Sequence, residues 1–302
     1  MQESYYSLNS YLKQCFGEKV YKISLDLGLS CPNRDGTLDT RGCIFCNNGS
    51  SHFAAKGCDI SEQIARAREL ISKKTDAKLF IAYFQSFTNT YAPAEQLEPI
   101  FKSVAERQDI AALSIATRPD CLPSDILQML ERLARIKPIF VELGLQTANE
   151  KTAEYIRRCY KNEVYCDAVA RLKAIGINVV THVIIGLPNE TREDILKTVK
   201  LAVDSGTNGI KLQLLHILRG TDLYDDYVNG KVFPLSIEEY MDILFDCIEH
   251  LPEETVVHRI TGDAPKALLA EPKWSADKKT VLNTINRELK ARGIRQGRLY
   301  NV

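Results

Sequence analysis

Three cysteines near the start of the sequence have the spacing of a metal site. Cys31, Cys43 and Cys46 share the segment CPNRDGTLDTRGCIFC, the last two as a C-x-x-C pair. A disulfide would leave one of the three thiols over. A structural zinc ion takes four ligands, so it would need Cys58 or His52 as well. A [4Fe-4S] cluster normally takes four cysteines, and three would leave one iron open to bind and activate a ligand.

Composition limits the classes of protein that this sequence allows. The 302 residues are 45% hydrophobic, enough for one large core. With 39 basic and 39 acidic residues the formal net charge is zero, so any nucleic-acid or membrane surface must be local. Nine cysteines, an odd number with three clustered, indicate reduced thiols rather than a secreted disulfide scaffold. We find no signal-peptide pattern and no apolar run near the roughly 20 residues that span a bilayer, and therefore expect a cytoplasmic protein without a membrane partner.

Strand-like and helix-like segments alternate from residue 20 onward. We expect strands at 21–29, 77–87, 110–120, 139–147, 178–188, 209–218 and 255–261. We expect helices at 59–74, 93–107, 123–136, 149–175, 191–206, 236–251 and 276–293. About six βα repeats with apolar strands predict a parallel sheet covered on both faces. A partial barrel and a doubly wound sheet both fit, and in either one ligands bind at the carboxyl ends of the strands.

The cysteine motif, with Phe45 just before its last cysteine, resembles that of the radical S-adenosylmethionine (SAM) superfamily. Its C-x11-C-x2-C spacing, with SLDLGLSCPNRDGT and GCIFC around it, is similar to the bacterial YhcC/YtqA-like group and the related Elongator catalytic-subunit-like branch. The resemblance runs from about Tyr21 to Arg298. It implies an α/β fold with a partial (β/α)6 TIM-type barrel at 21–262, an N-terminal extension at 1–20 and a C-terminal helical extension at 263–302.

The same resemblance implies the cofactors and their ligands. Cys31, Cys43 and Cys46 would hold a [4Fe-4S] cluster, whose open iron binds SAM and cleaves it reductively to a 5′-deoxyadenosyl radical. Candidate SAM contacts lie at strand ends and on the cluster loop: Phe45, Lys56, Gln85, Ser86, Thr88, Glu142, Gln146, Arg158 and Ile185. Arg158 would pair with the SAM carboxylate, with Arg157 as its competitor. The alternatives are helix capping for the group 85–88 and a barrel-interior network for Glu142.

Substrate residues are expected in two further motifs. LLHILRGTDL contains His216 and Arg219, and VVHRITGDAP contains Arg259 and Asp263; all four are substrate-side candidates, with a rim ion pair between Arg259 and Asp263 as the alternative. The C-terminal stretch is rich in basic residues that fit a phosphate footprint or a solvated helix face: Lys278, Lys279, Arg287, Lys290, Arg292, Arg295 and Arg298.

The resemblance implies tRNA, in its anticodon region, as the macromolecular partner. The expected reaction is radical remodelling at C5 of the wobble uridine, such as conversion of a carboxymethylaminomethyl group toward aminomethyl. A flavodoxin or ferredoxin would supply the electron. Two alternatives stay open: a radical SAM enzyme that acts on a small metabolite, and a zinc or iron–sulfur binding protein without SAM chemistry.

Overall fold

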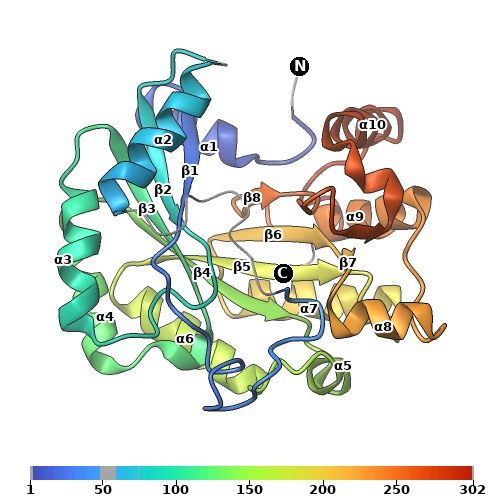
Figure 1. Ribbon diagram of the computed structural model, residues 1–302. Helices are drawn as coiled ribbons and strands as arrows, with labels where there is room; N and C mark the ends of the chain where they lie inside the picture. Colours follow the sequence, from blue (N-terminus) through green and yellow to red (C-terminus); the bar gives the residue numbers. More distant parts are fainter. Residues whose placement is uncertain (1–2, 48–58, 74, 301–302) are drawn as a thin grey trace.

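A curved parallel sheet forms the centre of the molecule (Figure 1). The computed structural model describes residues 3–47, 59–73 and 75–300. The sheet has seven strands in the order β1-β2-β3-β4-β5-β6-β8. Their bounds are β1 Val20–Leu25, β2 Leu79–Phe84, β3 Ile110–Thr117, β4 Ile139–Gln146, β5 Asn178–Ile185, β6 Gly209–Leu214 and β8 Val256–Arg259.

Strand order decides between the two sheet types that the sequence allowed. Strands that follow one another in sequence are neighbours in space, and every pair in the sheet is parallel. A doubly wound sheet reverses its order at a switch point, whereas this one does not. The predicted α/β fold with a partial TIM-type barrel is therefore confirmed, and the carboxyl ends of all seven strands lie on one side.

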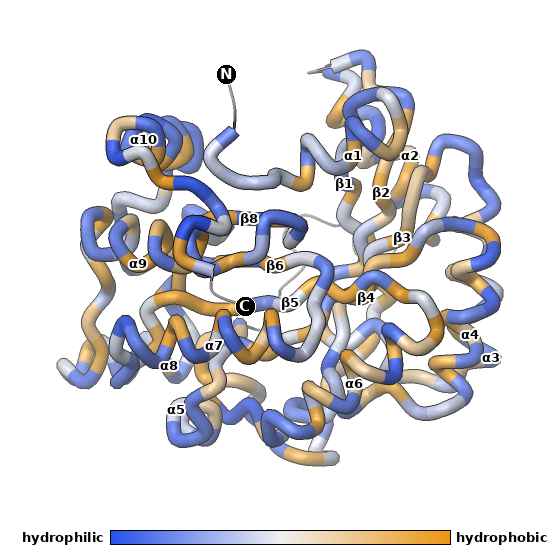
Figure 2. Tube along the Cα trace, turned by 180° about the vertical axis from the view of Figure 1, so that it is seen from behind, coloured by the Kyte–Doolittle hydropathy of each residue, from blue (hydrophilic) through white to orange (hydrophobic). Residues whose placement is uncertain are grey.

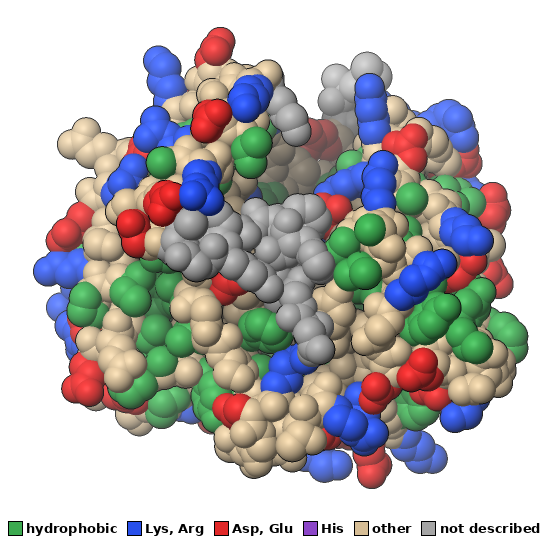
Figure 3. All heavy atoms as spheres, viewed as in Figure 1, with side chains coloured by type: hydrophobic (Ala, Val, Ile, Leu, Met, Phe, Trp, Pro, Cys, Tyr) green, Lys and Arg blue, Asp and Glu red, His purple; other side chains and the backbone are tan. Residues whose placement is uncertain are grey.

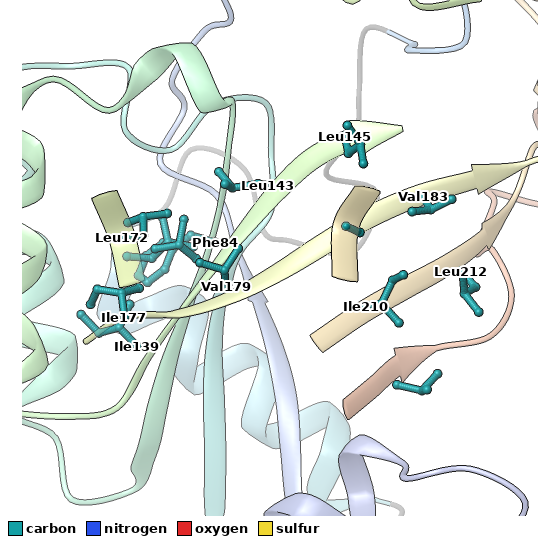
Figure 4. Packing of buried hydrophobic residues seen from close by; sticks show 14 of the residues in the cluster. Phe84, Ile139, Leu143, Leu145, Leu172, Ile177, Val179, Val183, Ile210 and Leu212 are labelled. Atoms are coloured by element: carbon teal, nitrogen blue, oxygen red, sulfur yellow. The ribbon is translucent and has the colours of Figure 1, made fainter. Parts of the chain in front are cut away.

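Helices cover the outer face of the sheet (Figure 1). The helices between strands are α2 Ile60–Ser72, α3 Ala94–Ala105, α4 Ser124–Ala134, α5 Glu150–Tyr155, α6 Asn162–Ala174, α7 Arg192–Asp204, α8 Asp222–Val228 and α9 Ile237–Glu249. Two more stand near the ends of the chain: α1 Leu8–Phe16 and α10 Lys278–Ala291. Alternate strand residues point outward into the main core, where Leu172 of α6 packs near Ile139 and Val179 (Figure 4). Figure 2 shows apolar residues concentrated along the strands.

The inner face of the sheet is apolar only near the amino ends of the strands. Val20, Ile81, Ala112, Phe140 and Val180 form a layer there, and Leu12 of α1 packs against it. This layer closes one end of the barrel. Further along the strands the inward side chains become polar, and this change positions the site described below.

Two expected elements differ from the structure. The segment 149–175 is two helices, α5 and α6, because Arg157 and Cys159 between them have positive φ angles of 56° and 63°, which a helix does not allow. The segment 209–218 divides into β6 and β7 Ile217–Leu218, and β7 pairs antiparallel with β9 Leu269–Glu271. Helix α8 was not predicted.

The extensions at 1–20 and 263–302 contain α1 and α10, and their boundaries remain a prediction. In the described ranges no helix is both long and apolar enough to cross a bilayer.

Candidate cofactor site

The loop that follows β1 carries the three cysteines and is held by its own side chains. Asn33 is fully buried; its Nδ2 donates to the carbonyl of Arg157 at 2.7 Å and lies 3.6 Å from the Cys43 sulfur. Arg34 Nη2 donates to the carbonyl of Cys46 at 2.6 Å. The two ends of the motif are thereby tied to each other and to the segment after α5.

The three sulfurs face one cavity. Burial, together with the neighbouring sulfurs of Cys46 and Cys31, raises the pKa of Cys43 to about 12. Thiolates so close to one another need a cationic centre to compensate their charge. Among the described residues no three Cys, His, Asp or Glu groups are placed to share one metal ion. Lys56 and the alternative zinc ligands Cys58 and His52 lie outside the described residues.

Four buried polar atoms beside this cavity have no hydrogen-bond partner among the described residues. They are Gln85 Nε2, Ser86 Oγ, Thr88 Oγ1 and Gln146 Oε1. Gln85, Thr88 and Gln146 line the cavity itself, whereas Ser86 is buried beside it. Orphaned polar atoms are rare in protein interiors. A polar ligand in the cavity would satisfy amide and hydroxyl groups of this kind, which suit the amino and carboxylate groups of an amino acid.

Backbone strain gathers around the same cavity. Phe87, Gln146, Arg157 and Cys159 have φ angles between 54° and 65°. Non-glycine residues with positive φ cost energy and are found preferentially at binding sites. In the described part of the chain only Asn189 adds to this set of strained non-glycine residues.

Arg158 lines the cavity, but the backbone holds its guanidinium. Its Nη1 donates to the carbonyls of Leu145 and Thr147 at 3.0 and 2.6 Å, and its Nη2 donates to the Tyr160 carbonyl at 2.7 Å. With 1% of its surface exposed, Arg158 ties β4 to the segment after α5. Arg157 donates to the Gly42 carbonyl at 2.8 Å and pairs with Asp222 at 2.5 Å. Arg157 thus supports the cysteine loop, whereas Arg158 supports the segment that follows β4.

Of two further predicted SAM contacts, one lines the cavity and the other does not. Phe45 lines the cavity and packs against a second apolar cluster that includes Ile44 and Ile156. Ile185 is fully buried in the main core, and its carbonyl accepts the Leu215 amide at 2.9 Å. The structure does not bring Ile185 into the cavity lining.

Polar side chains from all seven strands point into the barrel below this cavity, and we name this set the lumen ring. Its members are Lys22, Tyr83, Ser114, Glu142, His182, Lys211 and, from β8, both His258 and Arg259. Tyr83, Glu142 and His182 also line the cavity that the cysteines face. The lumen ring is therefore the floor of the cofactor site.

Glu142 is the centre of the lumen ring and has no exposed surface. Its Oε1 accepts from Lys22 at 2.9 Å and from Ser114 at 2.5 Å. Its Oε2 accepts from Lys211 and lies 2.7 Å from His182 Nε2. The expected alternative for Glu142, a barrel-interior network, is what the structure contains.

Burial and the charges within the lumen ring together determine which of its side chains are ionised. Burial alone would raise the pKa of Glu142, but Lys211, Lys22 and His182 hold it well below its usual value. Burial, with the charge of Lys211, lowers the pKa of His182 to about 4, so the imidazole is neutral and donates to the carboxylate. Burial keeps Tyr83 protonated by raising its pKa well above 10, and Lys211 donates to its hydroxyl at 3.1 Å.

None of the four substrate candidates lines the cavity, and only one belongs to the lumen ring beneath it. Arg259 belongs to the lumen ring as the register partner of Lys211. His216 is bound to Ser275 at 3.0 Å, Arg219 is exposed, and neither lines the cavity. Asp263 pairs with Lys278 at 2.5 Å. The alternative rim ion pair between Arg259 and Asp263 is wrong, because Lys278 of α10 takes the carboxylate.

The basic C-terminal stretch is largely neutralised. Four of its cations pair with acidic residues, two of which lie on α9 or at its end: Lys278–Asp263, Arg287–Glu288, Arg292–Asp242 and Arg298–Glu249. Lys279, Lys290 and Arg295 have no ion pair among the described residues. Figure 3 shows basic and acidic side chains mixed over the face drawn.

Sequence reasoning missed several residues that build the site. Lys22, Tyr83, Ser114 and Lys211 were not predicted, nor was Asn33. A signal was present, since Lys22 and Lys211 interrupt otherwise apolar strands, where an unpaired charge is costly. Their single shared partner, Glu142, becomes evident only when the strands are placed side by side.

The fold and the site define a class of protein: a parallel β/α half-barrel with a three-cysteine loop and a polar cavity at the carboxyl ends of its strands. A family model described as the radical SAM superfamily matches residues 40–202, and one described as the Radical SAM C-terminal domain matches residues 207–291. The chain belongs to the radical SAM superfamily, as the cysteine motif predicted.

Relatives in the curated collections agree with this membership. The chain is 43% identical over 301 residues to the uncharacterized protein YtqA of Bacillus subtilis, covering 99% of this chain and 94% of that one. It is 34% identical over 285 residues to protein YhcC of Escherichia coli, covering 94% and 91%. A tRNA uridine(34) acetyltransferase of Methanocaldococcus jannaschii is 29% identical over 164 residues, covering 53% of this chain and 30% of that protein.

Among solved structures, the archaeal Elp3 of Methanocaldococcus infernus superposes with a TM-score of 0.71 at 18% identity, covering 92% of this chain and 64% of that one. At this identity the likeness concerns the fold.

Proposed function

We propose that this protein is a radical SAM enzyme that modifies the C5 side chain of the wobble uridine in tRNA. The observation that carries the SAM part is the set of orphaned polar atoms at Gln85, Ser86, Thr88 and Gln146 beside three clustered thiols. When bound, a reduced [4Fe-4S] cluster and SAM would supply a 5′-deoxyadenosyl radical for hydrogen abstraction.

The chain's own residues would hold these groups in three ways. Cys31, Cys43 and Cys46 provide three thiolates, and Asn33 provides an amide donor beside one of them. Gln85 and Gln146 offer hydrogen bonds to the amino and carboxylate ends of SAM, while Phe45 offers an apolar face to its adenine. Arg158 positions the Gln146 segment through the carbonyls of Leu145 and Thr147.

Similarity supports the tRNA part. The archaeal relative named tRNA uridine(34) acetyltransferase is similar in sequence to about half of this chain, and the archaeal Elp3 has a similar fold. Lys279, Lys290 and Arg295 are the cations of the C-terminal stretch that remain for phosphates. A flipped anticodon base would enter the cavity from the carboxyl ends of the strands.

The first experiment tests the SAM chemistry with matched cysteine variants. Protein is purified and reconstituted without oxygen, and iron, sulfide and dithionite-dependent release of 5′-deoxyadenosine are measured. Wild type and Cys121→Ala should each bind about four irons per chain and release 5′-deoxyadenosine, whereas Cys43→Ala should do neither. Zinc in place of iron, with no SAM cleavage, would refute the proposal.

The second experiment tests the RNA. Charge reversal at Lys279, Lys290 and Arg295 should weaken tRNA binding and lower its salt dependence, by a slope of about one per lost phosphate contact. Reversal of the exposed Lys102, Lys197 and Lys200 serves as the matched control. Equal tRNA binding by both triple variants, or unchanged tRNA nucleosides in a deletion strain, would favour a small-metabolite substrate instead.

A further inference from the structure

The lumen ring contains more positive than negative charge. Lys22, Lys211 and Arg259 contribute three cations, whereas Glu142 contributes the only carboxylate and His182 is neutral. Glu142 already accepts from both lysines. Cations in a buried interior are costly unless anions compensate them.

Arg259 is the one of these three cations that has no carboxylate partner among the described residues. Among the described residues its guanidinium has no hydrogen bond and no ion pair. Its charge nevertheless acts on the ring, because it adds to burial and to Lys211 in lowering the pKa of His182. The nearby carboxylate of Asp263 is bound to Lys278.

The ring also lies where an incoming group must stop. Tyr83, Glu142 and His182 are shared with the cavity that faces the cysteines. Below them, the apolar layer with Phe140 and Val180 and helix α1 closes the barrel. A molecule that enters from the cysteine side therefore meets Tyr83, Glu142 and His182 of the lumen ring at the far end of the cavity.

We propose that the lumen ring binds a carboxylate of the substrate, with Arg259 and Lys211 as its cationic partners. The inference rests on the proposed function in one respect: it assigns the far end of that same site to the substrate. The planar guanidinium of Arg259 matches the two oxygens of a carboxylate. A phosphate dianion fits less well, because the oxygens of Glu142 in the same ring repel a second negative charge more strongly.

The test measures binding directly, with the full chain reconstituted without oxygen and with no SAM present. Acetate and its neutral isostere acetamide are titrated by calorimetry, as are 5-carboxymethyluridine and the corresponding amide. We expect the two carboxylates to bind and the two amides not to bind. Tighter binding of the nucleoside than of acetate identifies a nucleoside carboxylate as the ligand, and equal binding identifies a small free acid; both support a carboxylate site.

Arg259→Gln separates a binding role from a structural one. This variant should weaken carboxylate binding about tenfold or more, while the free protein keeps or raises its unfolding midpoint, since an uncompensated cation is removed. Arg259→Lys should restore part of the affinity, and the exposed Arg135→Gln should change neither quantity. Lys211→Gln is the second variant, and it should also weaken carboxylate binding.

Three results would overturn the inference: equal binding of acid and amide, tighter binding of methyl phosphate than of acetate, or unchanged carboxylate affinity in Arg259→Gln. These results are independent of the proposed function. SAM cleavage without carboxylate binding refutes only the carboxylate site, and carboxylate binding without SAM cleavage refutes only the proposed function.

Discussion

His182 Nε2 and Glu142 Oε2 lie 2.7 Å apart on neighbouring strands of the barrel interior. The same carboxylate accepts from Lys22 of β1, Ser114 of β3 and Lys211 of β6. One buried side chain thereby joins five strands of the sheet directly beneath the cofactor cavity. Its removal would affect both the stability of the barrel and the floor of the site.

We expect Glu142→Gln to lower the free energy of unfolding by about 3 to 5 kcal/mol, because it leaves Lys22 and Lys211 without their carboxylate. Unfolding in urea, followed by circular dichroism, measures this loss. Glu98→Gln is the matched control, since it breaks a surface ion pair with Arg132 at 2.7 Å and should change the stability little. Equal losses in the two variants would show that the lumen network does not stabilise the fold.

The buried histidines predict a stability that falls as the pH falls. Burial lowers the pKa of His182 and of His216 to about 4, whereas the pKa of a histidine in the unfolded chain is about 6.5. Between these limits the unfolded chain binds more protons, so the free energy of unfolding decreases toward acid. Glu142 adds to this loss at lower pH, since its depressed pKa stabilises the fold only while it is ionised.

Urea unfolding of the reconstituted protein at several pH values between 7.5 and 5 checks this prediction. His216→Gln keeps a donor toward Ser275 and removes one titrating group, so its stability should fall less steeply, by up to about 1.4 kcal/mol per pH unit. His250→Gln is the control, because that histidine is only half-buried at the end of α9, where its Nδ1 lies 2.8 Å from the Asp246 carbonyl. A slope identical to wild type in His216→Gln would contradict the burial of a neutral imidazole.

The sequence predicted a parallel sheet because its signals are local, and the resemblance of the cysteine motif then favoured the partial barrel. Apolar runs, helix periodicity and cysteine spacing are each contained in a short segment, and their repetition indicated a parallel sheet. The lumen ring combines residues from all seven strands, so no single segment displays it. Arg158 shows the same limit: the resemblance implied that it pairs with the SAM carboxylate, whereas its guanidinium donates to the carbonyls of Leu145 and Thr147.

We expect Arg158 and Gln146 to separate into a structural and a ligand-binding residue. Arg158→Gln should lower the unfolding midpoint clearly, because three carbonyl groups lose a charged donor. Gln146→Ala should leave the midpoint nearly unchanged, since its Oε1 has no partner among the described residues, but should weaken SAM binding about tenfold. Calorimetric titration of SAM into the reconstituted variants tests this, and weaker SAM binding only in Arg158→Gln would reverse the two roles.

Asn33 should decide how firmly the cluster loop retains its metal. Its Nδ2 binds the Arg157 carbonyl and lies beside the Cys43 sulfur, so Asn33→Ala should release iron to a chelator about tenfold faster and lower the midpoint potential of the cluster. Asn162→Ala is the matched control. It removes a similar hydrogen bond, from the Asn162 side-chain amide to the Ala148 carbonyl at 2.8 Å, at a place away from the sulfurs. Iron release and redox titration are measured for both variants. Equal release rates and potentials would mean that the amide merely fills space, and that the backbone alone fixes the three thiolates.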